Sequence, residues 1–210
     1  MTQSGAARSD EELAVAASRG SEAAFRELVE RFERPVYALI VRIVRRGEVA
    51  EELAQETFVK AWKALARFDP ERKFSSWIFK IAHNAALDAL RRRKDEALSL
   101  DAPFGDQEAP RELPADPRAE DPLERLTFRD AGRALEEALG GLRVEYREIL
   151  LLRFAEGLSY EEIAEVTGSP LGTVKVHIFR GRQELARRMR AAGWDPGELG
   201  ARRNPGRGPA

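Results

Sequence analysis

An acidic, proline-rich segment in the middle of the chain constrains the fold more than any other sequence feature. Residues 95–125 contain five of the eleven prolines and ten acidic residues against three arginines. Apolar residues do not recur there at the spacing of a helix or a strand. A segment of this composition does not bury enough apolar surface to fold by itself. We therefore expect residues 95–125 to be a flexible linker between two small domains, which suits a chain of 210 residues.

The first of these domains, residues 10–94, is predicted to be helical throughout. Apolar residues recur at helical spacing from Phe25 to Ile43, and Ser21 is suited to cap the helix that carries them. We expect a kink or a restart at Pro35 and a C-terminal cap at Gly47.

Two further helices are predicted before the linker. The apolar side of the first includes Leu53, Phe58 and Trp62, and a short polar loop at 68–74 separates it from the second. The second helix begins near Ser75 and ends in a run of basic residues. No segment shows the alternation of a strand, so the predicted fold class is all-α.

The second domain, residues 126–191, contains a compact pair of helices at its C-terminal end. Ser159 and Glu162 form the pattern of a capping box, and Gly168 ends the helix that they begin. Ser169 and the proline after it are predicted to begin a last helix that runs to about residue 191. Residues 192–210 are rich in glycine, proline and arginine and are expected to be a disordered tail.

This pair of helices is typical of a helix-turn-helix that reads DNA. In the last helix Val174, Ile178 and Leu185 are spaced to pack on the preceding helix. The remaining faces carry many hydrogen-bond donors: Lys175, His177, Arg180, Arg182, Arg187, Arg188 and Arg190. The alternative is an ordinary solvated basic helix. The capping box, the glycine turn and the basic face together favour DNA binding.

The sequence argues against enzymatic, metal-binding and membrane functions. There is no cysteine, and His83 and His177 are the only histidines, neither of them at metal-ligand spacing from a second ligand. No phosphate-binding loop occurs, and no nucleophile is paired with a base. No run of apolar residues reaches membrane-spanning length. We expect a cytoplasmic, non-enzymatic protein with no cofactor, no metal and no membrane insertion of its own.

Several motifs closely resemble those of a known family. EELAQETFVKAW (51–62), FSSWIFKIAHN (74–84) and ALDALRRR (86–93) resemble the second region of extracytoplasmic-function (ECF) sigma factors, which are sigma-70 family RNA polymerase sigma factors. GLSYEEIA (157–164), followed by GTVK and IFRGR, resembles their fourth region. The resemblance covers about residues 10–190 and has the acidic linker in the matching place. It implies a bacterial alternative sigma factor that binds core RNA polymerase and directs promoter-specific transcription initiation.

The resemblance also implies roles for individual residues. The C-terminal domain would read the minus-thirty-five element as duplex DNA, with these residues at the matching positions: Lys175, Val176, His177, Phe179, Arg180, Arg182 and Arg187. The N-terminal domain would recognise the minus-ten element and bind its melted non-template strand through a second set: Phe68, Lys73, Phe74, Asn84, Asp88, Arg91, Arg92 and Arg93. Core polymerase would bind a third set: Glu52, Gln55, Glu56 and Lys60. Trp77 could stack on a base, but its spacing favours a place in the core.

The expected partners are core RNA polymerase, promoter DNA and an anti-sigma factor that inserts between the two domains. The alternative is a conventional helix-turn-helix regulator whose N-terminal bundle dimerises or senses a ligand. That alternative predicts tight duplex binding by the free protein. The formal net charge of −1 and the basic cluster at residues 91–94 instead favour a protein that needs polymerase in order to bind DNA.

Overall fold

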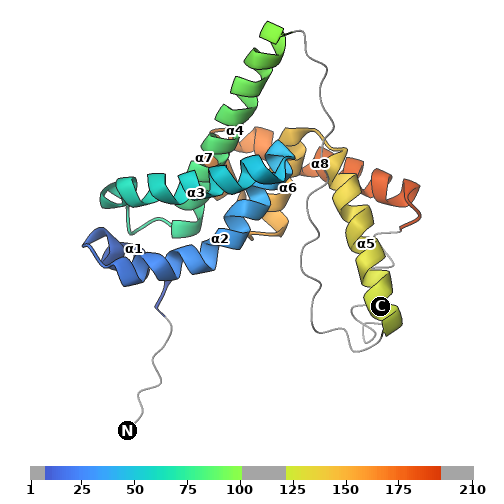
Figure 1. Ribbon diagram of the computed structural model, residues 1–210. Helices are drawn as coiled ribbons and strands as arrows, with labels where there is room; N and C mark the ends of the chain where they lie inside the picture. The colour runs from blue at the N-terminus through green and yellow to red at the C-terminus, as the bar shows by residue number, and fades with distance from the viewer. Residues whose placement is uncertain (1–7, 101–121, 195–210) are drawn as a thin grey trace.

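The computed structural model describes residues 8–100 and 122–194 of the chain. Every regular element in these residues is a helix, which confirms the predicted fold class (Figure 1). The remaining part of the predicted linker, residues 101–121, and most of the predicted tail, residues 195–210, lie outside the described residues.

The N-terminal half consists of α1 (Asp10–Ser18), α2 (Glu22–Val44), α3 (Gly47–Ala64), the short 3₁₀ helix η1 (Leu65–Arg67) and α4 (Phe74–Leu100). Ser21 caps α2 as predicted, because its hydroxyl accepts a hydrogen bond of 3.3 Å from the backbone N–H of Ala24.

One prediction in this half is wrong, and of the two alternatives given for Pro35 the structure excludes the restart. Helix α2 continues through Pro35 and does not restart there. The left-handed residue that ends α2 is Arg45, with φ of 55°, whereas Gly47 is the first residue of α3. An arginine in this conformation brings its Cβ close to the following carbonyl oxygen, which costs about 1–2 kcal/mol.

The C-terminal half consists of α5 (Pro122–Gly140), α6 (Val144–Phe154), α7 (Tyr160–Thr167) and α8 (Leu171–Ala191). The capping box of α7 is confirmed: the Ser159 hydroxyl accepts from the Glu162 N–H at 3.1 Å, and the Glu162 carboxylate accepts from the Ser159 N–H at 2.6 Å. Gly168 ends α7 with φ of 65°. The start of α8 differs from the prediction, since Pro170 and not Ser169 is its cap.

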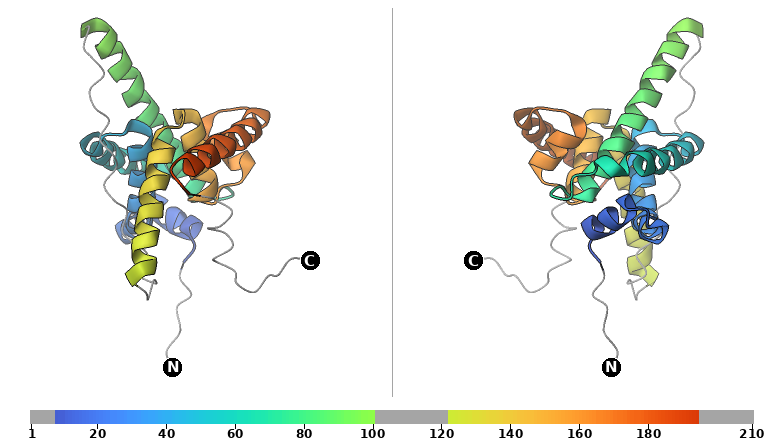
Figure 2. Two further views of the ribbon diagram at one scale, coloured as in Figure 1. Left: turned by 90° about the vertical axis from the view of Figure 1, so that its right-hand side faces the viewer. Right: turned by 90° about the vertical axis from the view of Figure 1, so that its left-hand side faces the viewer.

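The two halves pack against each other and share one hydrophobic core. Helix α4 contacts α7, and α2 contacts α6, so the two halves lie against each other (Figure 2). Buried side chains such as Ile40, Phe79, Ile149 and Ile163 belong to one continuous cluster. Helices α4 and α5 also reach into the predicted linker, because α4 ends at Leu100 and α5 begins at Pro122.

Buried polar groups bridge the two halves. His83 of α4 pairs through Nδ1 with Glu148 of α6, and both side chains are buried. Arg42 of α2 forms an ion pair with Glu136 of α5. Arg147 donates hydrogen bonds to the carbonyls of Leu139, Gly140 and Leu142 in its own half, and to the carbonyl of Arg42 in α2. The halves are therefore joined by specific polar contacts as well as by apolar packing.

Candidate nucleic-acid interface

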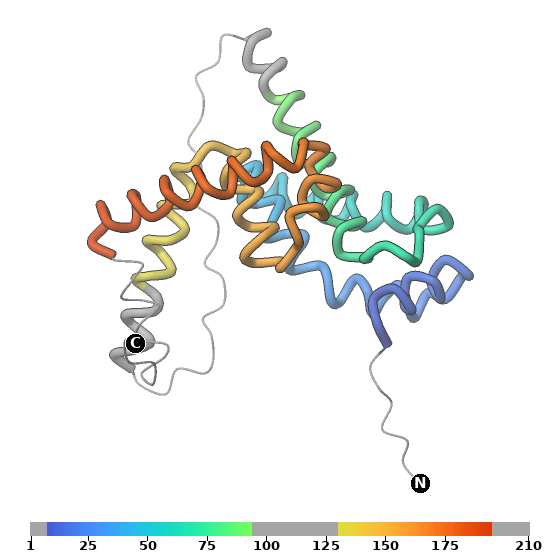
Figure 3. The backbone as a smooth tube through the Cα atoms, turned by 180° about the vertical axis from the view of Figure 1, so that it is seen from behind, coloured from blue at the N-terminus to red at the C-terminus, as the bar shows by residue number. Residues whose placement is uncertain are grey.

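Helix α8 is anchored on one side and exposed on the others. Val174 and Ile178 are buried, as predicted, and Gly181 allows α6 to approach closely. A Cβ at Gly181 would lie 3.2 Å from Cβ of Tyr146 and 3.3 Å from Cδ1 of Leu150. Seen from behind, α8 lies across the outer side of the C-terminal half (Figure 3).

The exposed surface of α8 combines positive charge with large apolar side chains. Phe179 is 62% exposed and Val176 is 44% exposed, and they lie beside the exposed Lys175 and Arg180. Apolar side chains contact the methyl group of thymine, while Lys and Arg bind guanine edges and phosphates. This composition is what a helix needs in order to read a major groove.

Three further predicted residues of α8 have partners within the protein. Arg182 stacks over the ring of Phe154, with its Cζ 5.8 Å from the ring centroid. Arg187 pairs with Glu184 at 2.6 Å, and this hydrogen bond lowers the pKa of the Glu184 carboxyl. His177 is partly buried and meets the ring of Tyr146 edge-on at 5.2 Å.

Part of the predicted minus-ten set lies along one side of α4. Asn84, Asp88 and Arg91 follow one another at helical spacing and are exposed, and Arg91 pairs with Asp88 at 3.3 Å. Arg92 is exposed and Arg93 is partly exposed. These side chains are accessible to a nucleic-acid strand in this structure.

The aromatic residues of the same set lie in the core. Phe68 and Phe74 are buried, with ring centroids 5.7 Å apart. Trp77 is partly buried and packs on both rings, at 5.5 and 5.6 Å. Phe68 and Phe74 shape the loop that precedes α4 and do not present a ring to solvent.

Lys73 lies in that loop but is held by the other half of the molecule. Its ammonium lies 2.9 Å from the Glu162 carboxylate of α7, and the neighbouring Arg72 lies 3.3 Å from Glu165 of the same helix. Burial opposes ionisation of Glu162, but its hydrogen bonds with Ser159 and Lys73 outweigh burial and lower the pKa of its carboxyl.

The predicted polymerase-binding residues share the outer surface of α3. Glu52, Gln55, Glu56 and Lys60 are all exposed, and Lys60 pairs with Glu56 at 2.8 Å. Trp62, which we expected in the core, is 40% exposed and packs against Phe25 at 4.8 Å. Val59 is exposed on the same helix.

A second exposed apolar surface was missed by the sequence analysis. A groove of about 1110 Å³ runs between α5, α6 and α8, and its walls include Leu135, Phe154 and Phe179. Phe154, the last residue of α6, is 61% exposed, although phenylalanine is usually buried. Exposed apolar surface of this kind is typical of a site for a macromolecular partner.

Comparison with known proteins identifies the family. Residues 28–96 match the family model described as Sigma-70 region 2, and residues 132–185 match that described as Sigma-70, region 4. The ECF RNA polymerase sigma factor SigW of Bacillus subtilis is 31% identical over 175 residues, which is 82% of this chain and 92% of that protein. The chain belongs to the ECF sigma factors.

Other relatives agree with this assignment. The RNA polymerase sigma-H factor of Pseudomonas aeruginosa is 36% identical over 177 residues, covering 84% of this chain and 91% of that protein. The solved complex of CnrH with the cytosolic domain of CnrY contains a chain with a TM-score of 0.60 and 27% identity, covering 87% of this chain and 97% of that one. The sigma factor RpoE of Bartonella quintana, solved with the anti-sigma factor NepR, shares the fold with a TM-score of 0.66 at 24% identity, covering 79% and 96%.

This ECF sigma factor is therefore an alternative sigma factor that directs transcription initiation. The alternative of a conventional regulator is not supported, because the N-terminal half matches sigma region 2. The described residues contain no group of three potential metal ligands. In the same residues no helix is both long enough and apolar enough to span a membrane.

Proposed function

We propose that this ECF sigma factor uses separate surfaces for polymerase and for the two promoter elements. Core polymerase binds the outer surface of α3, α8 reads the minus-thirty-five element as duplex, and α4 binds the melted minus-ten strand. The observation that carries the proposal is the exposed surface of α8, where Phe179 and Val176 stand among cations. The protein works in the cytoplasm and catalyses no reaction of its own.

The two halves separate when both promoter elements are bound. Elements one to two helical turns apart lie roughly 35–70 Å from each other. While the two halves are packed together, Glu162 forms an ion pair with Lys73 and competes for it with the minus-ten strand. The chain between the end of α4 and the start of α5, residues 101–121, can span at most roughly 70 Å, which permits this separation.

An anti-sigma protein restrains this factor by covering the surfaces that polymerase and DNA require. Two solved structures of similar proteins support this, since CnrH is bound to the cytosolic domain of CnrY and RpoE to the anti-sigma factor NepR. The apolar groove beside Phe154 and Phe179 offers such a partner a surface on the C-terminal half. Insertion between the halves, as we expected from the sequence, requires the contacts of α2 with α6 and of α4 with α7 to break.

The test is transcription with purified core polymerase, combined with promoter affinity measured with and without polymerase. We expect specific transcripts, and specific promoter binding only when polymerase is present. Glu56→Lys reverses a charge on the α3 surface and should abolish polymerase binding. Glu30→Lys, at an exposed position of α2, is the matched control and should have no effect. Equal promoter affinity with and without polymerase would refute the proposal.

A further inference from the structure

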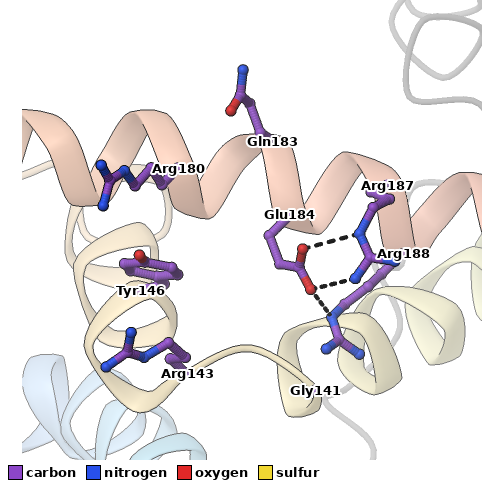
Figure 4. A pocket seen from close by; sticks show the side chains of 8 residues that line it. All are labelled: Gly141, Arg143, Tyr146, Arg180, Gln183, Glu184, Arg187 and Arg188. Carbon is purple, nitrogen blue, oxygen red and sulfur yellow. Dashed lines mark hydrogen bonds and ion pairs between the residues drawn. The ribbon is translucent and has the colours of Figure 1, made fainter.

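A cavity of about 470 Å³ lies beside α8 and shares Gln183 and Arg187 with the apolar groove. It is bounded by the turn before α6, by the first turn of α6 and by the second half of α8 (Figure 4). Its lining is strongly basic and consists of Gly141, Arg143, Tyr146, Arg180, Gln183, Glu184, Arg187 and Arg188.

Positive charge exceeds negative charge in this cavity. Arg187 and Arg188 both bind the single acidic group, Glu184, at 2.6 and 2.9 Å. Arg143 has only a distant carboxylate, that of Glu145 at 3.7 Å, and its Cζ lies 5.7 Å from the centre of the Tyr146 ring. Among the residues that the structure describes, Arg180 has no ion pair. Two guanidinium groups are therefore available to a ligand.

The backbone of Gly141, in the turn before α6, lies against the guanidinium of Arg188. A Cβ placed on Gly141 would lie 2.0 Å from Nη1 of Arg188. A larger residue at this position would make the end of the Arg188 side chain shift from the turn, while Arg188 now binds Glu184 on its other side (Figure 4). The cavity is thus lined by arginines from two segments that are distant in sequence.

We propose that this cavity binds a phosphate anion, with Arg143 and Arg180 as its direct ligands. Arginine presents a planar set of donors that matches the oxygens of a phosphate, and it does not lose its charge. Arg187 and Arg188 add positive potential at the rim, which Glu184 reduces but does not cancel.

The phosphate has two possible sources that share this chemistry. It is either a backbone phosphate of the duplex that α8 reads, a case that rests on the proposed function, or a free polyphosphate such as a nucleotide. A free anion would compete with DNA, because Arg180 is also a candidate for reading bases.

The experiment uses the full-length protein and two probes. In the first arm, pyrophosphate is titrated into protein without DNA and binding is measured by calorimetry. In the second arm, promoter affinity of the polymerase-bound protein is measured at several salt concentrations. The variant is Arg143→Ala, whose side chain is 73% exposed, so the fold should be kept. Arg190→Ala is the control, because Arg190 is exposed on the same helix but lines the apolar groove.

Each result has a defined meaning. Pyrophosphate binding that Arg143→Ala weakens at least fivefold, and Arg190→Ala less than twofold, supports the free anion. If pyrophosphate does not bind, but Arg143→Ala lowers the slope of log affinity against log salt by about 1 without changing base preference, the ligand is a backbone phosphate. If neither arm distinguishes Arg143→Ala from Arg190→Ala, the site is refuted. Because the first arm contains no DNA, it remains informative even if α8 does not bind a promoter.

Discussion

Replacing Arg147 by methionine should strongly destabilise the protein. The guanidinium is buried and donates to four backbone carbonyls. Three of them, at 2.8 to 2.9 Å, belong to the last residues of α5 and the turn after it, and the fourth belongs to Arg42 in the other half. Methionine fills similar space without a donor, so it removes all four hydrogen bonds.

The magnitude follows from these contacts. A hydrogen bond from a charged donor contributes about 1.5–3 kcal/mol, and leaving a buried carbonyl unpaired costs about 1–3 kcal/mol. Carbonyls of the turn regain water in part, which reduces the loss. Burial, together with repulsion from Arg45, lowers the pKa of Arg147 to about 10, so removing the charge returns part of its desolvation cost. We expect a net loss of about 3 kcal/mol, a large fraction of the usual 5–15 kcal/mol of a folded protein.

The assay is urea denaturation followed by circular dichroism. Arg153→Met is the matched control, because Arg153 lies on the same helix and donates to one carbonyl, that of Leu158 at 2.8 Å, within its own half. The control should lose about 1 kcal/mol. A loss below about 1 kcal/mol in Arg147→Met would show that the four contacts do not stabilise the fold as argued.

Four further substitutions test other parts of the structure. Arg45→Gly should raise the free energy of unfolding by about 0.5–1 kcal/mol, since φ is 55° there, and unchanged or lower thermal stability would contradict this. Glu162→Gln should destabilise at neutral pH. Because the pKa of the Glu162 carboxyl is lowered in the folded protein, the loss of stability should persist at every pH above the ordinary pKa of 4.5. It should vanish as the pH falls through the lower pKa of the folded protein. A loss that stays constant in denaturation experiments from pH 7 to 3 would exclude the ionised pair as its cause. Gly181→Leu should cost about 1–3 kcal/mol by overpacking α6, whereas Gly172→Leu, with nothing within 4 Å, should not show this loss in the same melting assay. Arg180→Ala should weaken minus-thirty-five recognition by about 1–3 kcal/mol in competition binding, and unchanged base preference would count against a base contact.

Local sequence signals located most of the helices, because the interactions that begin and end a helix involve residues close together in the chain. The Ser159 capping box and the Gly168 turn are examples, and both are as predicted. The inward positions of α8 follow from its periodicity in the same way. The basic surface of α8 was predicted to bind DNA from the helix-turn-helix pattern. The minus-ten and polymerase-binding residues were found through resemblance, since exposure alone does not distinguish them from ordinary solvated side chains.

Tertiary structure decided how the two halves meet and which polar groups are buried between them. His83 and Glu148 are 65 residues apart, so no local pattern relates them. Arg147 looks like a solvated arginine in sequence, and only the approach of α2 and the α5–α6 turn makes it a buried donor. Likewise Arg45, and not the nearby glycine, adopts the left-handed conformation where α2 ends. Burial and long-range pairing depend on the whole fold, because they are set by whichever segment packs on a residue and not by its neighbours in the chain.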